Sequence, residues 1–410
     1  MAELFWNEAE RGKMQAGINN IKGAAQKLVN NQAINLLSNY GSENFIVVPA
    51  SIGILQFLAS LLAGDRDEES IGNSVEKDED FHEAIKFTRN LLEGKSDLLG
   101  NEVTILHNVW LENGLKLDKE VQKLIATYCE TRILPLANDK IINIKKLQRK
   151  LQQLNKSGIF TDELRTAEFS EISPLETLFV SAVYITMEWR EPFLSSLTTK
   201  GTFRISETES IEAEMMVQKG GMVCVTCKNL NATVLQLPLT ARNMCLLVFL
   251  PNEKTKGVDT ISGRLTADVF QELMRQLGRA KPAPVYVTLP KFSLKHFGML
   301  PGRCEIKNQD DRSPEASGCR ILHMTKLTIN EFGLNTRERK SDQSEATVIS
   351  HVMHDGIKWT HFTASSPFLI ALVELEYELI FLIGKVERPE ITNNDRRCSG
   401  GRKVRRWRCI

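Results

Sequence analysis

The sequence predicts an α+β fold, with one domain over residues 1–390 and a basic tail over residues 391–410. Apolar residues at three- and four-residue spacing dominate residues 18–158 and indicate helices. Apolar runs rich in β-branched and aromatic residues dominate the rest and indicate strands. Neither half could bury its apolar surface alone, so the two are expected to share one core.

The first half is expected to be mainly helical. Helical periodicity marks residues 18–37, 52–64, 81–94, 119–133 and 141–158, the last of these a basic helix. Short strands are expected at 44–48, ending before Pro49, and at 102–111. Ser51 is expected to cap the apolar helix that ends at Gly64.

The second half is expected to be mainly strands. The run "LETLFVSAVYITMEW" is typical of a central strand, and "ATVLQLPL" and "NMCLLVFLPN" predict a hairpin. "TADVFQELMRQLG" predicts a helix capped by Thr266, with one apolar face through Phe270, Leu273 and Leu277. Further strands are expected in "VYVTLPKFSL" and "PFLIALVELEYELIFLIGKV".

The charge of the chain is concentrated at its end. The tail holds seven basic residues and one acidic residue, a net charge of +6, so the other residues carry −5 within the total of +1. Such a tail could bind a polyanion or a nucleic acid, or could remain a solvated, disordered segment. No secretory signal or membrane span is visible, which favours a cytoplasmic or nucleocytoplasmic protein over the extracellular alternative.

No motif for enzyme or cofactor chemistry is present. The glycine-rich dinucleotide and phosphate loops and the GxSxG pattern are all absent, so neither an enzyme nor a bound cofactor is expected. Cys224 and Cys227 have redox or zinc spacing but lie in an expected strand, where residues three apart face opposite sides. His351, His354 and His361 are expected to be solvated loop side chains, not metal ligands, because no acidic or cysteine ligand is near.

Seven blocks, taken in order, resemble one family. The blocks are "NFIVVPASIGILQFLASLLAG", "LFVSAVYITMEWREPF", "EAEMMVQKG", "VLQLPLTARNMCLLVFLPNE", "VTLPKFSL", "LTINEFG" and "HFTASSPFLIALVELEYELIFLIGKVERP". Together they run over residues 44–389 and are similar to the serpins, the serine protease inhibitor superfamily. The resemblance implies a monomeric single domain with a large mixed sheet, smaller sheets, about eight helices and an exposed reactive centre loop near residues 334–360.

The resemblance also assigns the residues that control opening of the large sheet. Ser51, Ser181 and His323 match the family's shutter, and Trp189 its breach tryptophan. Val48 replaces a shutter serine and Ser181 an asparagine, so the polar network is expected to be thinner than usual. Two further departures are Met187, where glycine is usual, and a link over residues 295–318 that is short enough to lose a helix.

The hinge of the loop departs furthest from the family. Serpins trap a protease as an acyl-ester by inserting the cleaved loop into the sheet as a strand. Glu331 and Gly333 keep their places, but the hinge reads "LNTRERKS" where small residues are usual. If Leu334 faces inward, Thr336, Glu338 and Lys340 face inward too, which buries a bulky side chain and two charges.

The expected function follows from this hinge. A serpin-family protein that presents its loop to a serine or cysteine protease without trapping it is favoured, and an efficient suicide-substrate inhibitor is the alternative. Counting from Glu331 places the reactive bond at Thr347–Val348, whereas counting back from Pro367 places it within residues 352–356. A trypsin-like enzyme would prefer Lys358 or the cluster at residues 337–340, so the protease specificity stays open.

Overall fold

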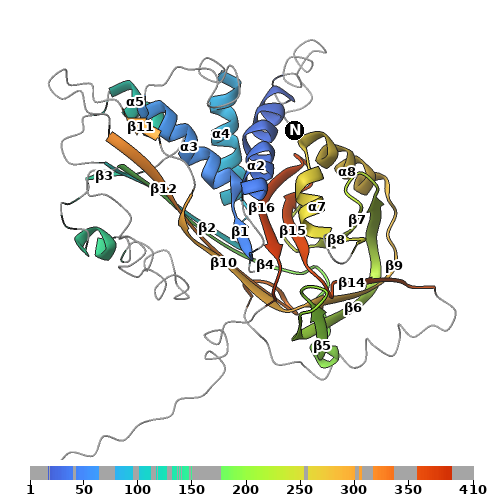
Figure 1. Ribbon diagram of the computed structural model, residues 1–410. Helices are drawn as coiled ribbons and strands as arrows, with labels where there is room; N and C mark the ends of the chain where they lie inside the picture. Colours follow the sequence, from blue (N-terminus) through green and yellow to red (C-terminus); the bar gives the residue numbers. More distant parts are fainter. Residues whose placement is uncertain are drawn as a thin grey trace, which may run out of the picture.

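The computed structural model describes most of the expected domain (Figure 1). The described residues are 19–39, 43–63, 79–95, 101–111, 119–126, 132–135, 141–146, 177–253, 257–300, 304–306, 317–336 and 358–389, with a few isolated positions between them. Two β-sheets and several helices share one core there, which confirms the α+β class. The basic tail, residues 337–357 of the loop, and with them Glu338, Lys340, Thr347, Val348, His351 and His354, lie outside the described residues.

One of the two sheets is a seven-stranded mixed sheet. Its strand order is β10–β12–β13–β4–β2–β3, and β11 pairs with β12. The strands are β2 (Glu102–Leu111), β3 (Arg132–Pro135), β4 (Thr177–Glu188), β10 (Phe292–Met299), β11 (Cys304–Ile306), β12 (Ser317–Asn330) and β13 (Gly333–Leu334). Strands β4 and β12 are parallel neighbours, whereas β2 and β10 pair antiparallel to them.

The second sheet has nine strands in the order β1–β16–β15–β8–β7–β6–β9–β14, with β5 beside β6. Its strands are β1 (Phe45–Val47), β5 (Thr199–Arg204), β6 (Ser210–Cys227), β7 (Ala232–Pro238), β8 (Met244–Pro251), β9 (Ala283–Pro290), β14 (Thr360–Thr363), β15 (Phe368–Glu374) and β16 (Leu379–Val386). The predicted hairpin is β7–β8, and the last apolar run forms β15 and β16, both fully buried.

Helices lie on both faces of the seven-stranded sheet, because Leu58 packs with Phe179 on one face. On the other face Ile144 packs with Leu178 and Val180. Helices α2 (Gln32–Asn39), α3 (Pro49–Ala63) and α4 (Glu79–Glu93) stand together beside the seven-stranded sheet, while α7 (Gly257–Arg264) and α8 (Ala267–Arg279) lie near β7, β8 and β15 (Figure 1). Helix α5 spans Lys119–Leu124, and short π and 3-10 turns occupy Lys27–Asn31 and Ser195–Leu197. Residues 19–26 and 141–146 are also helical. About eight helices were expected, and the described part of the chain holds six α-helices with bounds of their own besides these shorter stretches. None of the described helices has the length and apolar character needed to cross a bilayer.

Local predictions are confirmed at some caps and wrong at others. Thr266 caps α8 as predicted, because its side chain accepts a hydrogen bond from the Val269 amide at 3.2 Å. Ser51 does not cap α3, which starts at Pro49, so the serine lies inside the first turn and its hydroxyl points elsewhere. The helix expected over 119–133 is wrong at its end, because residues 132–135 form β3 against β2.

Candidate functional site

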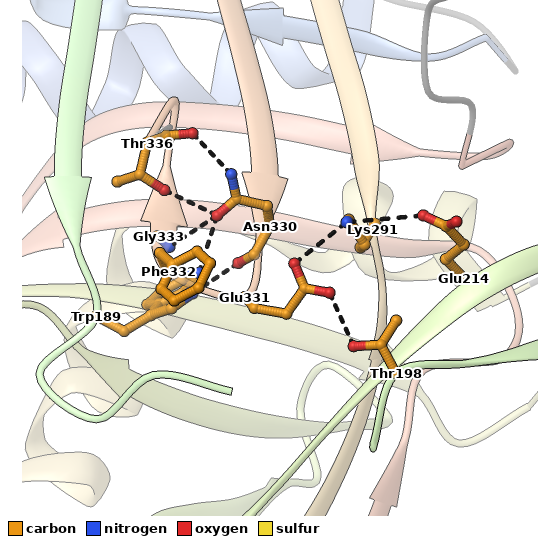
Figure 2. Close-up of polar contacts among 9 residues, drawn as sticks. All are labelled: Trp189, Thr198, Glu214, Lys291, Asn330, Glu331, Phe332, Gly333 and Thr336. Carbon is orange, nitrogen blue, oxygen red and sulfur yellow. Dashed lines mark hydrogen bonds and ion pairs between the residues drawn. The ribbon is translucent and has the colours of Figure 1, made fainter. Parts of the chain in front are cut away.

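The hinge of the loop is a tight hairpin at one end of the seven-stranded sheet (Figure 2). Strand β12 ends at Asn330, the chain turns through Glu331 and Phe332, and β13 returns between β12 and β4. Leu334 lies opposite Ile329 on β12 and Met187 on β4. Two residues of the hinge are therefore already part of the sheet.

Gly333 is required by the close approach of the hinge to β4. Its φ is +151°, a conformation that side-chain-bearing residues rarely adopt. A Cβ at this position would collide with the carbonyl oxygen of Met187 and the Cα of Glu188. Met187 itself is fully buried, so the methionine that replaces the family's usual glycine packs in the core beside the hinge.

Asn330 and Trp189 fix the shape of the turn. The Trp189 indole donates to the Asn330 carbonyl at 3.0 Å, and the Trp189 amide donates to the Phe332 carbonyl at 2.9 Å. The Asn330 side-chain oxygen accepts from the amides of Phe332 and Gly333, at 2.9 and 3.2 Å, and from the Thr336 hydroxyl at 2.8 Å. Trp189, expected from sequence as the breach tryptophan, thus lies 3% exposed directly against the hinge.

Glu331 anchors the same turn by a buried ion pair. Its carboxylate lies 3.2 Å from the Lys291 ammonium and accepts a hydrogen bond from the Thr198 hydroxyl at 2.8 Å (Figure 2). The Glu331 and Lys291 side chains are only 6% and 11% exposed. Glu214 lies on the other side of Lys291 at 3.7 Å. The turn is therefore held to β6 and to the residue between β9 and β10.

The residues that the resemblance assigns to the shutter lie further along β4 and β12, where the two strands pair directly. The Ser181 hydroxyl is 2.7 Å from that of Ser51 and 3.0 Å from Nδ1 of His323, whose Nε2 accepts from the Val48 amide at 3.2 Å. Ser51 also hydrogen-bonds Nε2 of His107 on β2. All four of these side chains are buried, and they form one connected polar network beneath the sheet.

His107 is the member of this polar network that the sequence did not reveal. It lies opposite Ser181 in the β2–β4 register and hydrogen-bonds the Ser51 hydroxyl. Burial, together with the charge of Arg89 on α4, lowers the pKa of His107 from 6.5 to about 3. Burial, His296 and His107 hold the pKa of His323 well below its usual value, and burial lowers that of His296 to about 4. The shutter histidines are therefore neutral at physiological pH.

Acid is expected to weaken this region. Below pH 6.5 these histidines bind protons in the unfolded chain but not in the folded one. The unfolding free energy is therefore highest above pH 6.5 and falls as the pH drops from 6.5 towards 3. Between pH 7 and pH 5 each fully buried histidine should cost about 2 kcal/mol of unfolding free energy. Urea unfolding at both pH values measures this loss, and His107→Gln should reduce it. An equal loss in the variant would contradict the assignment.

The cysteines and remaining histidines do not form a second site in the described part of the chain. Cys224, Cys227 and Cys245 are free thiols, and burial raises the pKa of Cys224 to about 11 and, with Glu374, that of Cys245 to about 12. Cys319 is disulfide-bonded, and its register partner on β11 is Cys304. The ring of His361 on β14 packs 5.3 Å from that of Tyr286. The described residues include no group of three potential metal ligands.

The chain is similar to one family of known proteins. The family model described as "Serpin (serine protease inhibitor)" matches residues 25–301. Among curated proteins, Serine protease inhibitor 42Dd of Drosophila melanogaster is 25% identical over 236 residues, 54% of this chain and 58% of that protein. A serine protease inhibitor of Cyanea capillata is 22% identical over 300 residues, 70% of this chain and 76% of that protein. The matches thus span roughly half to three quarters of the curated relatives, and the family match ends before the hinge.

Solved structures extend the likeness to about nine tenths of the chain. Human thyroxine-binding globulin with thyroxine has a TM-score of 0.70 at 16% identity, covering 90% of this chain and 99% of that one. Serpin48 of Tenebrio molitor has a TM-score of 0.64 at 15% identity, covering 91% and 99%. At such low sequence identities the likeness shows only that the fold is shared.

Proposed function

Since the chain belongs to the serpin family, we propose that it presents residues 337–357 to proteases as a cleavable loop and releases the enzyme without trapping it. The partner is a serine or cysteine protease, which cuts the loop as a substrate. The observation that carries this proposal is the register of β13, because it determines which side each following loop residue would take on insertion.

Continuing that register gives a position for every hinge residue. Leu334 is fully buried opposite Ile329 and Met187, so the sheet accommodates the bulky side chain that was expected to count against insertion. On the same face, Glu338 would lie between Val183 and Thr325, and Lys340 between Ser181 and His323. These four neighbours are at most 2% exposed.

Insertion would therefore bury two charges beneath the sheet. The effective desolvation penalty is several kcal/mol for each ion, and pairing between Glu338 and Lys340 would offset only part of it. Trapping requires insertion to be faster than hydrolysis of the acyl-enzyme. A penalty of this size slows insertion and favours release of the protease with a cleaved loop.

The competing candidate is a covalent inhibitor of a serine or cysteine protease. It is favoured by Gly333 and Leu334 already lying in the sheet, and by the curated relatives named as serine protease inhibitors. Elastase separates the two, because it cleaves after small aliphatic residues such as Ala346 and Val348. The proposal predicts a cleaved chain and active elastase, with no complex that survives denaturing electrophoresis. A stable complex at near-stoichiometric yield would support the inhibitor instead.

The location of the protein is part of the same proposal. A disulfide at Cys319 persists in an oxidising environment, which favours the extracellular alternative over the cytoplasm. An extracellular protease is then the partner of the loop. A possible polyanion partner of the basic tail is a prediction from its charge alone.

A further inference from the structure

The sheet contains a fork, the point where β4 and β12 separate to admit the hinge. The two strands pair directly from Thr177 and Cys319 up to Tyr184 and Lys326. Above this, β13 lies between them, with Leu334 opposite Met187 and Ile329. Three backbone groups line the fork between the two regions: the carbonyls of Ile185 and Lys326 and the amide of Thr328.

A single side chain, Asn335, binds all three of these groups. Its Nδ2 donates to the Ile185 carbonyl at 2.8 Å and to the Lys326 carbonyl at 3.0 Å. Its Oδ1 accepts from the Thr328 amide at 2.7 Å. The Asn335 backbone amide adds a hydrogen bond to the Thr328 carbonyl at 2.7 Å, and its own carbonyl accepts from the Tyr184 hydroxyl at 3.3 Å. One amide group thus occupies the place of the next inserted strand residue.

The backbone of Asn335 cannot continue β13 in this conformation. Its φ is +51°, in the left-handed region, whereas a strand residue needs a strongly negative φ. Further insertion requires Asn335 to leave that region, withdraw its amide from the fork and break the contacts to both strands. We propose that Asn335 is a positioning residue that halts loop insertion after Leu334 and holds the fork closed.

Asparagine suits both parts of this role. It adopts the left-handed conformation more readily than most residues, and its amide offers donors and an acceptor at once. Aspartate would keep the acceptor for the Thr328 amide but would oppose a carboxylate to the carbonyls of Ile185 and Lys326. Alanine would leave all three groups of the fork without this partner. Both replacements should therefore weaken the closed state.

This inference deepens the proposed function, on which it rests, because it concerns the same loop. Its test uses an uncharged synthetic peptide of alternating alanine and threonine, which can add to the open sheet as the missing strand. The rate of peptide incorporation into the intact, full-length protein reports opening of the fork. Since the peptide carries no charge, the result does not depend on Glu338 or Lys340, and it can fail while the proposed function stands.

Asn335→Ala and Asn335→Asp should each incorporate the peptide about tenfold faster than the wild type, since the closed sheet loses several hydrogen bonds that the peptide complex never contains. Asn243→Ala is the matched control. Asn243 also has a left-handed φ, +58°, and donates to Glu376 at 2.8 Å, but it lies in the β7–β8 turn. Incorporation at the wild-type rate in both Asn335 variants, or equal acceleration in the control, would overturn the proposal.

Discussion

Replacing Glu338 and Lys340 together by alanine should convert the protein from a protease substrate into a covalent trap. In the β13 register these residues would be buried between β4 and β12, so removing both charges removes the main penalty of insertion. The fraction of cleavage events that end in a stable protease complex should rise about tenfold or more, because one kcal/mol or so already changes a competing rate severalfold. Denaturing electrophoresis after reaction with elastase measures this fraction.

Arg337 and Arg339 provide the matched control. They alternate with the two inward positions, so on insertion they would take the opposite face of the sheet, Arg337 beside the partly buried Tyr184 and Arg339 beside the buried Ala182. From that face a long arginine side chain can extend its charge towards solvent. Their double replacement by alanine removes the same number of charges and leaves the partition between trapping and release nearly unchanged. If both double variants behaved alike, the burial argument would be wrong.

The second large effect concerns the ion pair that anchors the hinge turn. Lys291→Ala leaves the Glu331 carboxylate buried at 6% exposure without its nearest cation. Removing one partner of a buried pair costs about 3–5 kcal/mol, so the unfolding free energy should fall by that amount. Urea unfolding measured by tryptophan fluorescence is suitable, because Trp189 lies against the same turn.

An exposed ion pair of the same chemistry serves as its control. Lys200 and Glu212 lie 2.6 Å apart, but their side chains are 72% and 64% exposed. Lys200→Ala should therefore cost less than about 1 kcal/mol. Similar losses in the two variants would mean that the Lys291–Glu331 contact does not anchor the hinge.

The sequence predicted those features that depend on local pattern. Apolar runs located β7, β8, β15 and β16, and the position of Thr266 before an amphipathic face predicted its cap. The assignment of Ser51 to the shutter by resemblance stays a prediction, whereas its prediction as a helix cap is wrong. Pro49, which suits the first helical position, starts α3 two residues earlier and frees the serine hydroxyl for Ser181.

The residues that were missed act through tertiary contacts. His107 lies within an ordinary strand sequence, and only the pairing of β2 with β4 brings it to Ser51. Asn335 is a polar residue in a charged hinge, and its role depends on two strands that separate at that point. An asparagine directly after an inward-facing hinge residue was the available signal, since asparagine favours left-handed turns.

The thermal stability of the cleaved protein tests the central claim most directly. The loop is cut with elastase, mass spectrometry confirms a cut at or beyond Thr347, and the melting temperatures of intact and cleaved protein are compared. A loop that stays outside the sheet predicts a change of no more than a few degrees. A rise of about 20 °C or more, as a newly inserted central strand would give, would contradict the account.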